Sequence, residues 1–243
     1  MLIKSIIYAM IFSMLLIAAP AFAQSISSVS GATISPDTTE AEYRFGISET
    51  GTDESYSHRF GYGGAITDTL RLRGKLALSS DDFNSPEFSY FEADLLWHFY
   101  NADRFDSSLR LDVRYRDGNS PNRIGINTIN QLALNENWRL RFMLSLDGET
   151  GDAARSGLFA ETRASLSRKF ENGLRVGADL YNNYGNSDIG FGAFDDQRHV
   201  AGISVTGPGP QETSWTLGVL TGLSDSAPDQ VFQFRLQRRF DAH

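Results

Sequence analysis

Hydrophobic and polar residues alternate along most of this chain, and the alternation is clearest in the last segment, residues 230–240. Every second residue of this segment is apolar, with one interruption at Arg238: Phe232, Phe234, Leu236 and Phe240. The residues between them are polar or charged: Gln233, Arg235, Gln237 and Arg239. A period of two is the period of a β-strand, so the segment has one apolar and one strongly polar face. Either the polar face meets bulk water, or it encloses a wet interior while the apolar face contacts lipid.

Similar segments recur along the chain, separated by clusters of Gly, Pro, Asn and Asp that are typical of turns. We find no convincing helical period in the chain that follows the first 23 residues. We predict twelve strands, within a range of ten to fourteen, at about residues 41–49, 55–63, 69–79, 88–100, 105–116, 123–134, 138–147, 157–170, 173–183, 198–206, 214–222 and 230–240. In the sixth segment, Ile124 and Ile126 share a parity that Ile129 breaks, which predicts a β-bulge.

Residues 1–23 have the features of a secretory signal. Lys4 is followed by a short apolar run, and Ala21 and Ala23 give the small-x-small pattern of a cleavage site. Residues 24–39 are rich in Ser, Thr, Gly and Pro without periodicity, which predicts a flexible lead. Residues 40–243 then form the barrel domain.

No segment after residue 23 is an apolar run long enough to cross a bilayer as a helix. Only helices and closed sheets satisfy their backbone groups in lipid. If the chain lies in a membrane, it must be a single closed, antiparallel, up-and-down β-barrel. The links at 135–137 and 171–173 are tight, whereas those at 148–156 and 184–197 are longer, as in barrels with short periplasmic turns and long outer loops.

A soluble sandwich or a lipocalin-like barrel also alternates polar and apolar residues. Two features favour the membrane barrel. The apolar faces rarely carry a charge, and a lipid-facing Arg near the bilayer midplane costs about 2–4 kcal/mol. Aromatic residues also cluster near the predicted strand ends, as interfacial girdles require: Tyr43, Phe60, Tyr62, Phe88, Tyr100, Phe105, Tyr115, Trp138, Phe170 and Phe240.

The last segment resembles the terminal strand of bacterial outer-membrane β-barrels, which ends in Phe after alternating apolar residues. Phe240, Leu236, Phe234 and Phe232 match that pattern, whereas Arg238 and the three residues after Phe240 depart from it. The resemblance implies export through the periplasm to the outer membrane. It also implies outer-membrane lipid, lipopolysaccharide and the barrel assembly machinery as partners.

Charge distinguishes the two faces of the predicted strands. Without Lys4, 21 basic residues stand against 30 acidic ones, a formal charge of −9, so nucleic acid is not expected as a partner. The inward face is nevertheless net basic and rich in arginine. We predict that the pore-lining residues include Arg71, Arg73, Lys75, Arg110, Arg114, Arg139, Arg141, Arg163, Arg175, Arg235, Glu92, Asp94 and Asp112.

A basic lumen lowers the free energy of anions inside it, and arginine presents a planar fork suited to carboxylate, sulfate or phosphate. The hypothesis is a narrow pore that favours small anionic solutes such as acidic sugars. In strand number and arginine-rich lumen, the pattern is similar to the acidic-oligosaccharide porins of enteric bacteria. The alternative is a closed, structural or surface-interaction barrel in which these arginines pair with the inward acids and nothing is transported.

Catalysis has little support in the sequence. His98 is the histidine predicted to face inward, beside Asp94, and a hydrogen-bonded wall residue explains it better than a lipid-modifying enzyme does. We therefore expect no enzymatic activity, no cofactor and no catalytic residues. Oxygen-bearing residues in and just before the 184–197 loop fit no calcium motif, so we expect no metal site there: Asn182, Asn183, Asp188, Asp195 and Asp196. That loop reads as mobile, folding over the pore mouth or contacting lipopolysaccharide.

Overall fold

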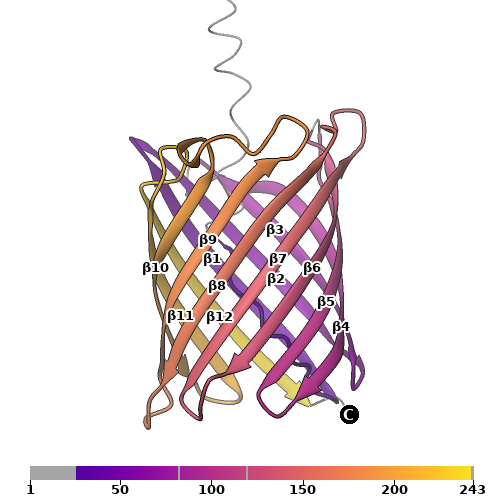
Figure 1. Cartoon of the computed structure of the whole chain (residues 1–243), viewed down its shortest axis with the longest axis vertical. Coiled ribbons are helices and arrows are strands. Elements are labelled where there is room, and N and C mark those ends of the chain that lie inside the picture. Colours follow the sequence, from indigo (N-terminus) through magenta and orange to yellow (C-terminus); the bar gives the residue numbers. More distant parts are fainter. Residues whose placement is uncertain (1–25, 82, 119, 242–243) are drawn as a thin grey trace, which may run out of the picture.

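The computed structural model describes residues 26–81, 83–118 and 120–241, which form a closed antiparallel β-barrel (Figure 1). The strands are β1 (Thr38–Thr50), β2 (Asp53–Thr67), β3 (Leu70–Ser80), β4 (Glu87–Ala102), β5 (Phe105–Tyr115), β6 (Asn122–Ala133), β7 (Trp138–Thr150), β8 (Leu158–Lys169), β9 (Arg175–Asn186), β10 (Arg198–Pro208), β11 (Thr213–Gly222) and β12 (Gln230–Asp241). A short 3₁₀ helix, η1 (Phe194–Asp196), precedes β10. The predicted all-β, twelve-strand, up-and-down barrel is confirmed, while the predicted signal at residues 1–23 lies outside the described residues.

Each strand pairs with its neighbours in sequence, and β12 pairs with β1 to close the ring. In this closing pair, Tyr43 lies opposite Leu236 and Phe45 opposite Phe234, so the apolar faces of the two strands coincide. Closure leaves no unpaired sheet edge, which is what a sheet needs in lipid. No helix in the described part of the chain is long and apolar enough to cross a membrane.

The two ends of the barrel differ in their connections (Figure 1). At the end that holds Thr38 and Asp241, here called the turn end, the links between strands span two to five residues. At the opposite end, the loop end, the links include residues 151–157 and 187–197. Outer-membrane barrels place short turns in the periplasm and longer loops outside, so the turn end corresponds to the periplasmic side.

The outer surface of the barrel is apolar. Outward side chains in the middle of the strands leave large apolar areas uncovered, with Phe91 48%, Leu111 49% and Leu217 41% exposed. Two outward arginines, Arg168 and Arg238, lie near the turn end, where the guanidinium of Arg238 stacks over the Phe240 ring at 4.9 Å. An apolar belt of this size has a favourable free energy against hydrocarbon and an unfavourable one against water.

Ile129 corrects one sequence prediction. The expected bulge in β6 is wrong, because β6 keeps a continuous register with both β5 and β7. Ile129 breaks the apolar parity because it points inward, where it is fully buried against Leu96, Met143 and Ala32. Register shifts occur elsewhere, in the β2–β3, β3–β4, β4–β5 and β8–β9 pairs.

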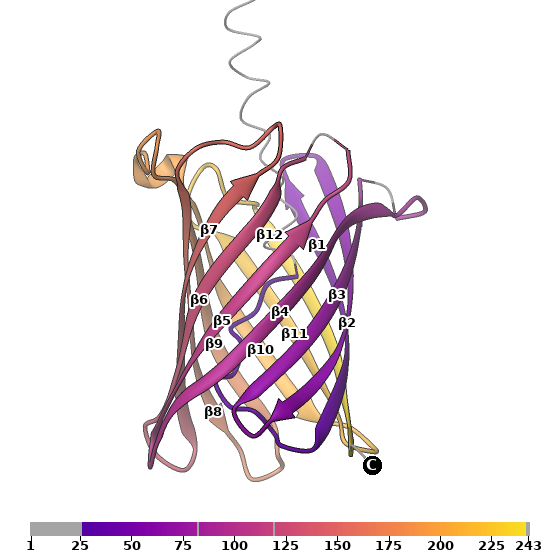
Figure 2. The same ribbon diagram turned by 90° about the vertical axis from the view of Figure 1, so that its right-hand side faces the viewer.

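Residues 26–37, the lumen segment, run inside the barrel before the chain enters β1 (Figure 2). Ile26, Ser27, Val29 and Ala32 are buried there. The sequence predicts a flexible lead for residues 24–39, and the structure places residues 26–37 against the inner wall. Flexibility of this segment stays a prediction, but its position makes it part of the barrel interior.

Candidate functional site

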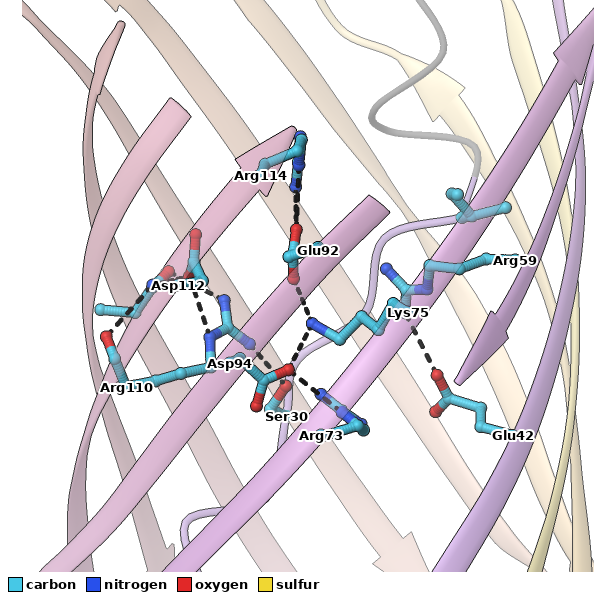
Figure 3. A network of polar contacts seen from close by, with 12 residues as sticks. Ser30, Glu42, Arg59, Arg73, Lys75, Glu92, Asp94, Arg110, Asp112 and Arg114 are labelled. Carbon is cyan, nitrogen blue, oxygen red and sulfur yellow. Dashed lines mark hydrogen bonds and ion pairs between the residues drawn. The ribbon is translucent and has the colours of Figure 1, made fainter. Parts of the chain in front are cut away.

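The inner wall on β1 to β5 is a network of ion pairs (Figure 3). Arg73 Nε lies 3.1 Å from Asp94 Oδ2, and Lys75 Nζ lies 2.6 Å from the same oxygen. Lys75 also donates to Glu92, whose other oxygen lies 2.6 Å from Arg114 Nη2. Burying an ionised group costs desolvation free energy, and only opposite charges and hydrogen bonds around the group offset that cost. This wall therefore neutralises itself.

Strand register explains the pairing. Lys75 lies directly opposite Glu92, and Arg73 directly opposite Asp94, across the β3–β4 pair. Arg114 lies opposite Glu92 across the β4–β5 pair. Side chains at facing positions lie on the same face and within reach of each other, so acid and base meet by register alone.

Two further ion-pair groups extend the network around the ring. Glu42 accepts two hydrogen bonds of 2.8 Å from Arg44 and lies 3.2 Å from Arg59. On the other side, Arg110 lies 3.3 Å from Asp112, which also accepts a 2.6 Å hydrogen bond from Asn127. The inward wall of the first five strands thus offers few guanidinium groups without a carboxylate.

The wall formed by β7 to β12 near the turn end is different. Four arginines there, the four-arginine cluster, line one cavity of about 280 Å³: Arg139, Arg141, Arg175 and Arg235. No carboxylate of the described chain lies within ion-pair distance of any of these four guanidinium groups. The acidic side chain that lines the cavity, Asp179, forms no ion pair with them.

Neutral groups take the place of carboxylates in this cluster. Arg235 donates to Thr216 Oγ1 at 3.0 Å, and Arg175 donates to Ser167 Oγ at 3.3 Å. Arg139 Nε is buried and has no hydrogen-bond partner within the described residues. Register again gives the reason, because facing positions hold Ser or Thr instead of acids: Arg139 opposite Ser167, Arg141 opposite Ser165, Arg175 opposite Thr206 and Arg235 opposite Thr216.

Hydroxyl groups also line the 280 Å³ cavity, from Ser165, Ser167, Ser204, Thr206, Ser214 and Thr216. A hydroxyl both donates and accepts hydrogen bonds, so it can bind a sugar hydroxyl as well as water. The cavity therefore combines strong cationic donors with adaptable neutral groups. That combination suits a small, hydroxylated anion.

The lumen segment divides the interior. A second cavity of about 50 Å³ lies within the ion-pair network, and Ser27, Ser28 and Arg44 line both this cavity and the 280 Å³ one. Arg44 Nη1 donates to Ile26 O at 3.1 Å and to Ser28 Oγ at 2.6 Å. The segment and Arg44 therefore lie between the two spaces that a crossing solute would have to join.

The loop end carries a smaller group of charges. Glu149 lies 3.3 Å from Arg123 and 2.6 Å from Arg155, and both guanidinium groups stack over the Phe159 ring. Just beyond β5, burial and then the nearby Arg123 lower the pKa of Arg116 to about 10, which still leaves Arg116 charged at neutral pH. The basic groups of Arg116, Arg123 and Arg155 therefore lie at this end together with the carboxylate of Glu149.

The thirteen residues predicted to line a pore separate into two sets. The first set lies in the 280 Å³ cavity: Arg139, Arg141, Arg175 and Arg235. The second set surrounds the smaller cavity: Arg73, Lys75, Glu92, Arg110, Asp112, Arg114 and Arg163. Asp94 belongs to the ion-pair network, and Arg71 lies 3.8 Å from Glu40 nearer the turn end. Whether they line a conducting pore stays a prediction.

Inward apolar residues were missed by the sequence reading. Val200, Leu220 and Val231 are buried on the inner wall, where Val29 of the lumen segment packs among them with Tyr181. Alternation is weak in β10 because apolar residues there occupy both faces. The sequence signal was that these apolar residues fall on the inward face of their strands. That signal can be interpreted only when the segment that packs against them inside the barrel is known.

His98 is a wall residue. Its Nε2 lies 3.2 Å from Asp106 Oδ1, while the predicted neighbour Asp94 is held by Arg73 and Lys75. Among the residues that the structure describes, no group of three or more His, Asp or Glu side chains is placed to hold a metal ion. In the 187–197 loop, Phe194 stacks on His199, an outward-facing residue of β10, with ring centroids 4.3 Å apart, so this residue does not fold over the lumen.

No family model matches the sequence, and no curated protein matches it. Solved structures do share its fold. An outer membrane channel from Pseudomonas putida F1 superposes with a TM-score of 0.66 at 12% identity, covering 88% of this chain and 100% of the channel. NanC porin has a TM-score of 0.58 at 7% identity (81% and 97% covered), and KdgM porin 0.56 at 10% identity (84% and 99% covered).

At such identities the similarity concerns the fold. The closed barrel, its exposed apolar belt and these similar structures define the class: the chain is a bacterial outer-membrane β-barrel protein. The predicted class is confirmed, and with it the outer membrane as the compartment.

Proposed function

We propose that this barrel is an outer-membrane channel that favours small anionic solutes, which bind in the four-arginine cluster. The observation that carries the proposal is the contrast between the two inner walls. Basic groups on β1 to β5 are matched by carboxylates, whereas Arg139, Arg141, Arg175 and Arg235 line a 280 Å³ cavity and form no ion pair within the described chain. Four unneutralised guanidinium groups lower the free energy of an anion between them.

Barrel geometry strengthens this effect. A lumen bounded by low-dielectric walls focuses the electric field, which raises the local concentration of oppositely charged solutes. Each guanidinium can also donate two parallel hydrogen bonds to one carboxylate, sulfate or phosphate group. Arg139 Nε is buried without a hydrogen-bond partner in the described chain, so this guanidinium is incompletely satisfied by the barrel itself.

Cavity size and lining narrow the solute class. A volume of about 280 Å³ is near the lower end of the roughly 300–1,000 Å³ of small-molecule sites. Six Ser and Thr hydroxyls of the barrel wall line it, so a single-ring sugar acid fits both its size and its polarity. KdgM porin has been solved in complex with disordered oligogalacturonate, a polymer of sugar acids, which supports this solute class for a barrel of the same fold.

Ion selectivity in planar bilayers tests the proposal. We expect the reversal potential in a salt gradient to show anion preference, and we expect it to shift toward cations in an Arg139→Gln, Arg175→Gln, Arg235→Gln variant. The matched control removes outward arginines, as Arg168→Gln and Arg238→Gln, and should leave the reversal potential unchanged. Cation preference in the unmodified protein, or an equal shift in the control, would refute the proposal.

A second candidate is a closed structural barrel. Its support is the interior itself, where the lumen segment separates the two cavities and ion pairs fill the wall on β1 to β5. The absence of conductance in both the complete protein and a variant without residues 26–34 would favour this candidate over a channel.

A further inference from the structure

The lumen segment has two kinds of contact with the barrel, and the first kind is apolar. Val29 is 4% exposed and packs in the inward cluster of Tyr181, Val200, Leu220 and Val231. Ala32 is fully buried against Leu96, Ile129 and Met143. In a water-filled lumen these inward apolar patches would be exposed to water, which is unfavourable. They fit the segment that covers them.

The second kind of contact is polar and involves inward arginines. Arg44 donates to Ile26 O and Ser28 Oγ, Arg110 donates to Ser30 Oγ at 3.4 Å, and Arg141 donates to Val29 O at 3.4 Å. All of these acceptors are neutral. A carboxylate or sulfate accepts stronger, charge-assisted hydrogen bonds from the same guanidinium groups.

The composition of the lumen segment allows an anionic ligand to replace these polar contacts. Residues 26–36 contain no charged side chain, and the segment forms no ladder with a strand before β1 begins at Thr38. Two of its polar contacts are long, at 3.4 Å, where hydrogen bonds are weak. A segment held in this way stays in place through small apolar anchors and a few neutral acceptors.

We infer that residues 26–37 are a removable plug, and that an anionic solute in the four-arginine cluster promotes its release. Arg141 belongs to that cluster and holds Val29 O, and Arg44 lines the same cavity and holds Ile26 O. A carboxylate that binds these two guanidinium groups replaces Ile26 O and Val29 O as the acceptor of their hydrogen bonds, so the plug loses these contacts with the barrel. Displacement of Ser27 and Ser28 then joins the two cavities that they now line.

The solute-dependent part of this inference rests on the proposed function, whereas the plug itself does not. Deletion tests the plug directly. A variant that lacks residues 26–34 keeps residues 1–25 for export, and it keeps Ser35, whose carbonyl accepts a 2.9 Å hydrogen bond from Thr38 at the start of β1. We expect this variant to form a larger and steadier conductance than the complete chain. An unchanged conductance would overturn the plug.

A disulfide clamp tests whether the plug has to move. The chain has no cysteine, so the pair Ala32→Cys and Ser108→Cys introduces the only two thiols. Ser108 Oγ donates to Ala32 O, which places these positions side by side. The control pair, Ser48→Cys and Ser55→Cys, joins facing residues of β1 and β2 whose hydroxyls lie 2.6 Å apart, away from the plug.

We expect the oxidised clamp to abolish conductance and reduction to restore it, with no redox effect in the control pair. Equal conductance of the oxidised and reduced clamp, with the disulfide verified by mass, would overturn the inference. Where the disulfide does not form, the deletion variant alone decides.

Solute coupling is tested with galacturonate against neutral galactose. Galacturonate should raise the open population of the complete chain by about fivefold or more, the usual scale of coupling between two sites, and should have no such effect on the deletion variant. Equal responses to the two sugars would overturn the coupling. A deletion variant that opens but prefers cations would refute the proposed function while leaving the plug intact. An anion-selective protein whose conductance does not change on deletion would refute the plug while leaving the proposed function intact.

Discussion

The Glu92→Gln variant tests whether the ion-pair network stabilises the barrel. Glu92 is 2% exposed. One of its carboxylate oxygens accepts a hydrogen bond from Lys75, and the other accepts two from Arg114, at 2.6 and 2.9 Å. Glutamine keeps the size and shape of the side chain, but it removes the charge and replaces one accepting oxygen with a donating NH2 group. The two cations then remain buried with less compensation.

The expected magnitude follows from what each cation retains. Removing one partner of a buried ion pair costs roughly 3–5 kcal/mol because a charge is left uncompensated. Lys75 keeps Asp94 at 2.6 Å, and Arg114 keeps a cation–π contact with the Tyr90 ring at 4.3 Å. We therefore expect the lower end of that range, a loss of about 3 kcal/mol in the free energy of unfolding.

Equilibrium urea unfolding in lipid vesicles measures this loss. Intrinsic fluorescence reports it, because Trp97 and Trp138 lie on the outer face of the barrel, 50% and 37% exposed. Glu87→Gln, at an exposed position of the same strand, is the matched control and should change the free energy by no more than about 0.5 kcal/mol.

A double-mutant cycle sharpens the test. Lys75→Met removes the charge opposite Glu92, so the Glu92→Gln, Lys75→Met double variant should lose less stability than the sum of the two single losses, by about 0.5–3 kcal/mol. A Glu92→Gln barrel as stable as the control, or strictly additive losses, would show that the network does not hold the wall together.

Three further predictions concern packing and the lipid face. Ala32→Leu overfills the fully buried site of Ala32, which should cost about 1–3 kcal/mol and raise the open probability in bilayer recordings by weakening the plug. Gly202→Ala places a Cβ 2.0 Å from a backbone oxygen of β11, so its unfolding midpoint should fall, whereas Gly74→Ala, whose Cβ meets only the Phe91 ring at 3.7 Å, should change it little. Leu217→Arg puts a charge into the outer belt and should lower the unfolding free energy in vesicles by about 2–4 kcal/mol, and no loss would mean that this face does not contact hydrocarbon.

The barrel itself was predictable from the sequence because each strand residue meets one of two very different environments. Leu111 and Leu217 face lipid, whereas Arg114 and Arg235 face the lumen, so the two-residue period of the sequence follows the two faces of the barrel wall. Strand number and topology followed, since a membrane sheet must close.

The difference between the two inner walls was not predictable. Arg114 and Arg235 look alike in sequence, yet one faces Glu92 across a strand pair and the other faces Thr216. Which residues face each other depends on the register between strands, and alternation within one strand holds no information about it. Bulges such as the one between His98 and Tyr100 shift that register further.

The lumen segment was hidden for a different reason. Ser, Gly and Ala residues without periodicity have the composition of a linker, and their burial depends on a cavity that exists only after the barrel has closed. Ile129 carried one sign of it, because this apolar residue has the parity of the lumen. A bulge explains the parity of Ile129 from the neighbouring residues of β6 alone. The prediction was wrong because Ile129 packs against Ala32, which is 97 residues away in the sequence.

The basic groups of one inner wall are paired with carboxylates and those of the four-arginine cluster are not, so the charge inside the barrel is distributed asymmetrically. Carboxylates on β1 to β5 pair with the basic groups beside them, while the four-arginine cluster on β7, β9 and β12 forms no ion pair within the described chain. In the proposed channel, a molecule with a single acidic group would pass along the wall that holds the four-arginine cluster, with its acidic group turned toward that wall. Mirror-image or epimeric solutes would present their remaining hydroxyls to different neighbours, so a barrel of this kind would distinguish stereoisomers of equal size and charge.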